Sequence, residues 1–291
     1  MTSGGDPGRR LGWPSCTVRG RPVSYLSAGD GPPLLFLHGW GLSHASYRGT
    51  LRRLVDHGMR VLAPALPGFG GTPDLPADEL SLAGYARWTG DFLDAVGVAE
   101  PVTLVGHSFG GGVAIRIAHD GPHRVSRLVL VNSIGGSAWT DGTGVLRAMR
   151  ERPMWDWGLH LRADVLPLRR LTRVLPVIMD DAVGNLLRNP LAIWRVANLA
   201  RTADLRAELE VLKRRRLPVV VIWGRRDRVI PAASMAALSA ALGDPGVVTV
   251  DGNHSWLLSD PRAFVEVITN VLQPGVADPG EDAGPATGCS A

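Results

Sequence analysis

The sequence is poor in lysine, in cysteine and in long apolar runs, and each shortage argues against a class of protein. Lys213 is the only lysine, so arginine supplies nearly all of the 31 basic residues and the net charge of +4. These arginines are not grouped with a reading element or with stacking aromatic residues, which argues against nucleic-acid binding. No run approaches the ~18 apolar residues of a membrane-spanning helix. We therefore expect neither a nucleic-acid partner nor stable membrane insertion.

The two cysteines, Cys16 and Cys289, lie near opposite ends of the chain. Neither has the Cys/His spacing of a zinc site, and a single distant pair is not a disulfide framework. The first residues, 1–10, are rich in Gly, Pro and charge and lack the apolar segment of a secretory signal. The sequence thus predicts a cytoplasmic protein without a structural metal.

Apolar residues make up 45% of the 291 residues and charged residues 20%, enough for a sizeable core. A short hairpin is expected first, with Gly20-Arg21 at its turn. Short apolar runs then alternate with segments of helical spacing, a pattern that predicts βαβ units and a mostly parallel, doubly wound sheet. The expected strands of this sheet are 34–37, 61–63, 102–105, 128–131, 219–223 and 247–250.

The alternation breaks between Gly135 and Leu217, where helical spacing, prolines and four of the nine tryptophans occur without a strand of comparable strength. We interpret 135–217 as an inserted helical cap. The core is then formed by 15–134 and 218–273. Residues 1–14 are expected to be a flexible lead, and the Gly/Pro/Ala-rich residues 274–291 a disordered tail.

The segment Gly106-His107-Ser108-Phe109-Gly110 fits the pattern G-x-S-x-G between an expected strand and an expected helix. In that context the serine lies on a sharp turn and is held exposed as a nucleophile. Small flanking residues are needed because the strand must turn abruptly into the helix. Ser108 is therefore the predicted nucleophile.

A serine hydroxyl needs a base to remove its proton, and the base needs a group that orients it. His254 follows the last expected strand, and Asp227 follows the strand 219–223, so both lie at strand ends, where doubly wound sheets place their sites. The order Ser, Asp, His also fits this architecture. We predict Asp227 and His254 as the acid and the base.

An acyl-transfer site also needs hydrogen-bond donors for the oxyanion of the tetrahedral intermediate. The backbone N–H of Phe109, directly after the nucleophile, is one candidate. The backbone N–H of Trp40, in the segment His38-Gly39-Trp40-Gly41, is the other, because Gly39 permits a close approach of the backbone.

Four segments together resemble the α/β-hydrolase superfamily from about Arg21 to Leu272. The resemblance implies an α/β-hydrolase fold with an inserted helical cap and a serine hydrolase that needs no cofactor. Dehalogenases and soluble epoxide hydrolases of the superfamily use an aspartate nucleophile, so Ser108 argues against both. The four segments are His38-Gly39, Gly106 to Gly111, Gly224 to Pro231 and Gly252-Asn253-His254.

The expected reaction is cleavage of a carboxylic ester or related acyl bond through a covalent acyl-enzyme. Three alternatives remain open: a carbon–carbon bond hydrolase, an acyltransferase or perhydrolase, and a ligand-binding member without catalysis. The superfamily's carbon–carbon hydrolases often have Asn before the serine and a Gly-Pro-Gly oxyanion loop. This sequence has His107 and Gly41-Leu42-Ser43 instead, which weakens that alternative.

Other residues near these motifs offer competing interpretations. Asp251 is a minor alternative to Asp227 as the acid that orients His254. Asp227 could also be a surface carboxylate that pairs with a neighbouring arginine. The other acid position, after strand 128–131, holds Asn132. His38 and His107 are interpreted as structural histidines.

The substrate is expected to be a small molecule, largely apolar because of the cap tryptophans. The cap also carries 15 basic and 9 acidic residues. This excess of positive charge indicates either a solvated basic face or a surface that favours an anionic substrate.

Overall fold

The computed structural model describes residues 11–136 and 179–273. About half of the predicted cap, residues 137–178, lies outside the described residues, as do the predicted tail, 274–291, and residues 1–10 of the predicted lead. Within the described part of the chain, eight strands form one sheet in the order β1-β2-β4-β3-β5-β6-β7-β8. The strands are β1 (Ser15–Val18), β2 (Arg21–Ala28), β3 (Pro33–Leu37), β4 (Arg60–Pro64), β5 (Val102–His107), β6 (Val125–Val131), β7 (Val219–Gly224) and β8 (Val247–Val250).

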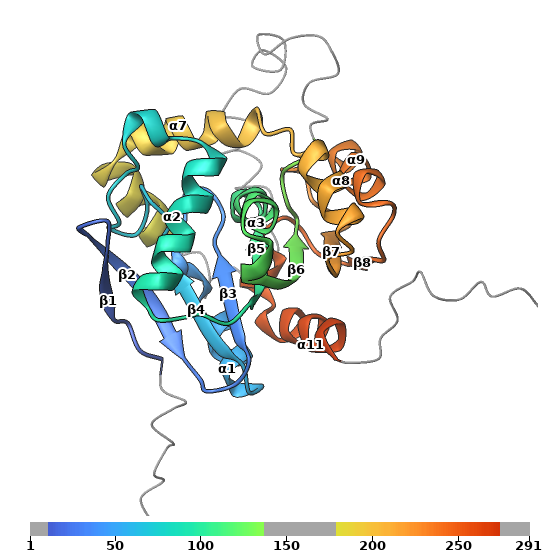
Figure 1. Ribbon diagram of the computed structural model, residues 1–291, viewed down its shortest axis with the longest axis horizontal. Coiled ribbons are helices and arrows are strands. Elements are labelled where there is room, and N and C mark those ends of the chain that lie inside the picture. The colour runs from blue at the N-terminus through green and yellow to red at the C-terminus, as the bar shows by residue number, and fades with distance from the viewer. Residues whose placement is uncertain (1–10, 137–178, 274–291) are drawn as a thin grey trace, which may run out of the picture.

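Helices cover both faces of the sheet (Figure 1). Residues 179–188 are also helical and precede α7. A 3-10 turn, His44–Tyr47, comes directly before α1, which begins at Arg48. The helices are α1 (Arg48–Asp56), α2 (Leu82–Ala95), α3 (Phe109–Asp120), α7 (Pro190–Arg201), α8 (Arg206–Arg214), α9 (Ala232–Leu242), α10 (Trp256–Ser259) and α11 (Pro261–Leu272).

The sheet is antiparallel only at the β1 end. β1 pairs with β2 and β2 with β4 in antiparallel register, whereas all other pairs are parallel. The hairpin turn contains Arg19 and Gly20, one residue earlier than predicted. Both have positive φ, 52° and 75°, as a two-residue turn between twisted strands requires, and glycine takes the second of these positions.

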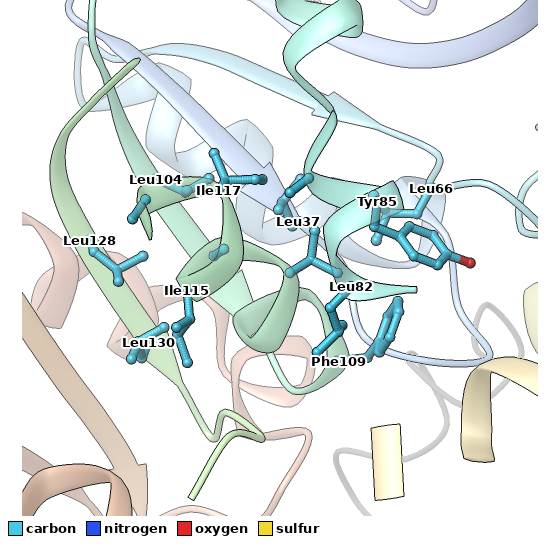
Figure 2. Close-up of a cluster of buried hydrophobic side chains, with 14 of the residues drawn as sticks. Leu37, Leu66, Leu82, Tyr85, Leu104, Phe109, Ile115, Ile117, Leu128 and Leu130 are labelled. Carbon is cyan, nitrogen blue, oxygen red and sulfur yellow. The ribbon is translucent and has the colours of Figure 1, made fainter. Parts of the chain in front are cut away.

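The side chains of β3 show why the parallel strands have uninterrupted apolar sequences. Leu35 and Leu37 pack into a cluster with α2, α3, α8 and α9 on one face of the sheet, part of which Figure 2 shows. Leu34 and Phe36 pack on the other face with α1, α10 and α11. Because successive side chains point to opposite faces, a strand covered on both faces must be apolar at every position. The predicted mostly parallel, doubly wound sheet is confirmed.

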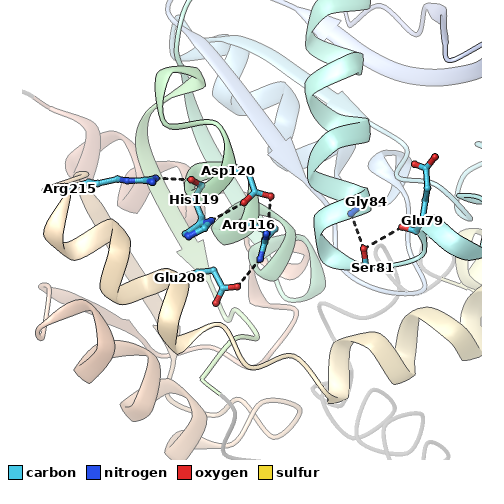
Figure 3. A network of polar contacts seen from close by, with 8 residues as sticks. All are labelled: Glu79, Ser81, Gly84, Arg116, His119, Asp120, Glu208 and Arg215. Carbon is cyan, nitrogen blue, oxygen red and sulfur yellow. Dashed lines mark hydrogen bonds and ion pairs between the residues drawn. The ribbon is translucent and has the colours of Figure 1, made fainter.

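Polar contacts fix the helices that flank the sheet. Ser81 caps α2, where its Oγ accepts a hydrogen bond from the Gly84 N–H at 3.0 Å (Figure 3). Arg116 of α3 pairs with Glu208 of α8 at 2.8 Å, and Arg215 donates to the His119 carbonyl at 2.7 Å. The segment α8, which the sequence pattern assigned to the cap, is thus attached to the helices that cover the sheet. The cap boundary at 217 stays a prediction.

Candidate active site

Ser108 lies between the end of β5 and the first residue of α3. Its backbone has φ 54° and ψ −117°, a conformation that is unfavourable for a residue with a side chain. The surrounding structure holds this conformation, since the Ser108 N–H donates to the Val131 carbonyl at 3.0 Å and the Ser108 carbonyl accepts from Gly111 at 3.0 Å. The sharp turn predicted at this serine is therefore present.

Two glycines allow this turn because backbone passes close to both of them. A Cβ on Gly106 would lie 2.5 Å from the Gly110 carbonyl oxygen. A Cβ on Gly110 would lie 2.4 Å from the Leu37 carbonyl oxygen, on the neighbouring strand β3. Neither contact can be relieved by moving a flexible side chain, so the tight packing of α3 against the sheet requires glycine at both positions.

The structure brings Ser108, His254 and Asp227 into one hydrogen-bonded chain. His254 Nε2 lies 3.0 Å from Ser108 Oγ, and His254 Nδ1 lies 2.9 Å from Asp227 Oδ2. The side chains of His254 and Asp227 are 6% and 0% exposed. A neutral imidazole with its proton on Nδ1 would donate to the carboxylate and accept from the serine hydroxyl, the arrangement that a nucleophile and its base require.

Asp227 is held by donors on both of its carboxylate oxygens. Oδ1 accepts from the N–H groups of Val229 and Ile230 at 2.8 and 3.0 Å, and Oδ2 accepts from Asn132 Nδ2 at 2.5 Å as well as from His254. Burial by itself would raise the pKa of this carboxyl. The charge of His254 and the hydrogen bonds from His254, Asn132 and Ile230 outweigh burial and lower the pKa. Asp227 is thus kept ionised.

Asn132 was noted in the sequence only as the acid position without a carboxylate. In the structure it follows β6 with φ 46°, and its amide joins two segments, because it donates to Asp227 and accepts from Trp256 Nε1 at 3.0 Å. Its place at a strand end next to β7 was the one available signal. The sequence did not predict the contact.

The rival acid, Asp251, points elsewhere. Its side chain is 65% exposed and pairs with Arg226 at 3.3 Å and with Arg225 at 4.0 Å. The sequence left open that a neighbouring arginine pairs with Asp227. In the structure Asp227 is buried and pairs with the imidazole of His254. The geometry therefore favours Asp227 as the partner of His254.

The two candidate oxyanion donors lie on segments that meet at Ser108. Phe109 is the first residue of α3, and N–H groups in the first turn of a helix have no acceptor within the helix. Gly39, next to Trp40, approaches so closely that a Cβ there would lie 3.3 Å from the Cβ of Ser108. This places the loop after β3 beside the nucleophile, as predicted.

The profile of the Alpha/beta hydrolase family matches residues 34–267. The chain belongs to the alpha/beta hydrolase family. The predicted fold class is confirmed, and the protein is a hydrolase.

Relatives of this hydrolase include esterases. A pimeloyl-(acyl-carrier protein) methyl ester esterase of Aeromonas salmonicida is 29% identical over 266 residues, which cover 84% of this chain and 97% of the esterase. An uncharacterized protein of Mycobacterium tuberculosis is 30% identical over 284 residues, which cover 88% of this chain and 80% of the relative. Among solved structures, a membrane phospholipase A described as a bacterial virulence factor has a TM-score of 0.74 at 23% identity, covering 91% and 86% of the two chains. The similarity to the phospholipase structure shows that the two proteins share a fold.

In this hydrolase His107 links the loop after β3 to the segment that carries His254. Its Nε2 lies 3.0 Å from the His254 carbonyl oxygen, which can only accept, so Nε2 carries the proton. Its Nδ1 then accepts from the Tyr47 hydroxyl at 2.8 Å, and Tyr47 Oη accepts from the Gly39 N–H at 3.1 Å. Burial lowers the pKa of His107 to about 3, so the ring stays neutral. The interpretation of His107 as structural agrees with these contacts, whereas Tyr47 had no sequence signal.

His38 binds the same loop from the protein core. Its Nδ1 donates to the Gly39 carbonyl and its Nε2 accepts from the Leu66 N–H, both at 2.9 Å. Burial lowers its pKa to about 4. A neutral ring with both nitrogens engaged fits the structural role predicted from the sequence.

Two kinds of feature are absent from the part of the chain that the structure describes. Among residues 11–136 and 179–273, no three His, Cys, Asp or Glu side chains gather in a way that could hold a metal ion. Within the same ranges, no helix is both long and apolar enough to cross a bilayer.

Proposed function

We propose that this hydrolase cleaves carboxylic esters or related acyl bonds by covalent catalysis at Ser108. The observation that carries the proposal is the hydrogen-bonded chain from Ser108 Oγ through His254 to Asp227, with distances of 3.0 and 2.9 Å. The esterase among the relatives supports the same reaction class. No cofactor takes part in the proposed reaction.

The proposed reaction begins when Ser108 Oγ attacks the substrate carbonyl carbon and His254 Nε2 takes the hydroxyl proton. The imidazolium that forms is stabilised by the ionised Asp227. The carbonyl oxygen becomes an oxyanion, which accepts hydrogen bonds from the N–H groups of Trp40 and Phe109. The intermediate collapses, the alcohol leaves with the proton from His254, and the acyl group remains on Ser108.

Deacylation repeats these steps with water as the nucleophile. His254 removes a proton from water, the hydroxide adds to the acyl carbonyl, and the same two N–H groups hold the second oxyanion. Collapse of this intermediate releases the carboxylic acid and returns the proton to Ser108.

We propose a small, largely apolar substrate that also carries an anionic group. Arg201, at the end of α7, is 7% exposed, and burial lowers its pKa. No hydrogen bond or ion pair joins its guanidinium to another described residue. An unpaired buried cation is costly, and we propose that an anionic group on the substrate is the partner of Arg201. The cytoplasmic location stays a prediction.

The first test is covalent labelling of the purified protein by a fluorophosphonate, together with turnover of short p-nitrophenyl esters. We expect labelling and turnover in the wild type and loss of both in Ser108→Ala, with kcat reduced by about 10⁴-fold or more. Folded wild-type protein that neither reacts nor turns over esters would contradict the proposal and favour a ligand-binding member. Product analysis with added alcohol or peroxide separates hydrolysis from transfer to another acceptor.

A further inference from the structure

The helical residues 179–188 contact the loop that carries Trp40, although more than 130 residues separate them in the sequence. Asp181 is the centre of this contact. Its carboxylate accepts from the Ser43 N–H at 2.7 Å, from Ser43 Oγ at 2.9 Å and from Ser46 Oγ at 2.6 Å. The loop thus donates three hydrogen bonds to one carboxylate on the cap side of the site.

Asn185, one helical turn after Asp181, extends the contact to two more backbone groups. Its Nδ2 donates to the Gly41 carbonyl at 3.1 Å, and its Oδ1 accepts from the Gly70 N–H at 2.8 Å. The residue is 1% exposed. A buried amide with both of its ends bonded to backbone fixes the position of that backbone.

The side chain of Trp40 is held by the next helix. Its Nε1 donates to the Ile193 carbonyl of α7 at 2.8 Å. Residues 40, 41, 43 and 46 are therefore each anchored to residues 181–193, while Tyr47 and His38 hold the start of the loop from the core.

The loop needs such anchors because its own sequence leaves it free to move. Gly39 and Gly41 flank Trp40, and Gly41 has φ +77°, so the backbone on either side of the proposed donor is conformationally permissive. An oxyanion donor acts only when its N–H is already aimed at the position that the oxyanion will occupy. Hydrogen bonds from a rigid helix to the adjoining residues meet that requirement.

We propose that Asp181 and Asn185 are positioning residues that hold the Trp40 N–H in place for the oxyanion. The proposal rests on the ester hydrolysis proposed above. In this arrangement residues 181–193 complete the oxyanion hole through their contacts with the loop.

The test compares Asp181→Ala and Asp181→Asn with Asp180→Ala and Asp180→Asn. Asp180 is the neighbouring residue of the same helical segment, is exposed, and has no hydrogen bond or ion pair with the described residues. Turnover of a p-nitrophenyl ester is measured per active site, with the sites counted by fluorophosphonate titration, alongside inhibition by an arylboronic acid. The boronate forms a tetrahedral adduct with a serine and so reports on the oxyanion hole without turnover.

We expect kcat per titrated site to fall about 10- to 100-fold in Asp181→Ala and about 10-fold in Asp181→Asn, less than the loss of an entire donor. KM should stay within about twofold, because the ground-state ester gains little from the oxyanion donor. Boronate affinity should fall by the same factor as kcat, and the Asp180 variants should match the wild type.

Other results would overturn the proposal. If kcat per titrated site and boronate affinity stay at wild-type values while only the fraction of active protein falls, Asp181 has a purely structural role. If Asp181→Ala does not fold, the same readouts on Asp181→Asn decide, since asparagine keeps the size and one acceptor oxygen. A wild type without labelling or turnover would refute the proposed function itself, and that outcome is recognised before any variant is compared.

Discussion

The two sides of the site bury polar groups in opposite ways. On the acid–base side, after β7 and β8, a buried charge is kept: Asp227 is ionised and accepts hydrogen bonds from four donors. On the oxyanion side, around the loop after β3, the buried imidazoles are neutral, and the carboxylate of Asp181 that binds the loop is only partly buried. His38, His44 and His107 are all buried, and burial lowers the pKa of each to about 4 or 3.

The difference follows from what each side must do during the proposed reaction. The acid–base side has to stabilise an imidazolium that forms and disappears, for which a fixed negative charge is effective. The oxyanion side has to keep backbone N–H groups in position, and the neutral rings of His38 and His107 contribute to this because each donates one hydrogen bond and accepts another. The two sides should therefore respond differently to loss of charge and to acid.

The largest expected effect is on the charged side. Asp227→Asn should lower kcat by about 10⁴-fold, because the amide cannot stabilise the imidazolium and favours the wrong tautomer of His254. Steady-state kinetics with a p-nitrophenyl ester measures this. Asp251→Asn is the matched control, since that carboxylate is exposed and paired with arginines, and its kcat should stay within about twofold. Comparable losses of kcat in the two variants would contradict the assignment of Asp227 as the acid.

The second effect is on the neutral side and concerns stability in acid. The folded pKa values of the three histidines lie below the unfolded value of about 6.5, so their contribution is complete above that pH and is lost as pH falls toward their folded pKa. Between pH 7.5 and 5, each should reduce the free energy of unfolding by about 2 kcal/mol, a factor of about 30 in the equilibrium. Urea unfolding at the two pH values measures the loss.

A pair of variants isolates one histidine in that experiment. His107→Gln should reduce the difference between the two pH values by one histidine's share, while His123→Gln, at an exposed position, should leave it unchanged. Equal pH dependence in wild type and His107→Gln would show that the ring is not buried in its neutral form.

The third effect tests the link between the two sides. Tyr47→Phe leaves the Gly39 N–H and His107 Nδ1 without their hydrogen-bond partner, so it should lower kcat about 10-fold and the free energy of unfolding by about 1–3 kcal/mol. Kinetics and urea unfolding provide both numbers. Tyr25→Phe is the control, because that half-buried ring makes no hydrogen bond through its hydroxyl to another described residue. If Tyr47→Phe keeps the wild-type kcat and free energy of unfolding, the hydrogen bonds of Tyr47 do not couple the two sides of the site.

The smallest effect concerns substrate charge. Arg201→Gln should raise KM for a carboxylate-bearing ester about fivefold and leave KM for a neutral ester of the same size unchanged, because only the former gains from the guanidinium. KM for the charged ester in the wild type should also rise with salt. Arg195→Gln, exposed on the same helix, serves as the control. Identical KM changes for the two esters would remove the anionic substrate from the proposal.

Much of the fold could be predicted from the sequence, and so could the segments that meet at Ser108, whereas the roles of the five proposed site residues stay a prediction. The runs 34–37 and 219–223 predicted buried strands because a strand covered on both faces is apolar throughout. The pattern around Ser108 predicted the turn because close backbone contacts at Gly106 and Gly110 exclude any side chain. Asp227 and His254 could be placed because parallel strands end at one edge of the sheet, where successive loops lie side by side.

The contacts of Tyr47, Asn132, Asp181 and Asn185 could not be predicted in this way. Each is a common residue without a local pattern, and each acts on a partner far along the chain: Asn132 on Asp227, 95 residues away, and Asp181 on Ser43, 138 residues away. Such partners are chosen by how packed segments approach one another, which depends on the whole core. Backbone preference and apolar periodicity are properties of contiguous residues and so determined the strands, the turn at Ser108 and the order of the motifs, whereas the packing of distant segments decided which polar groups meet.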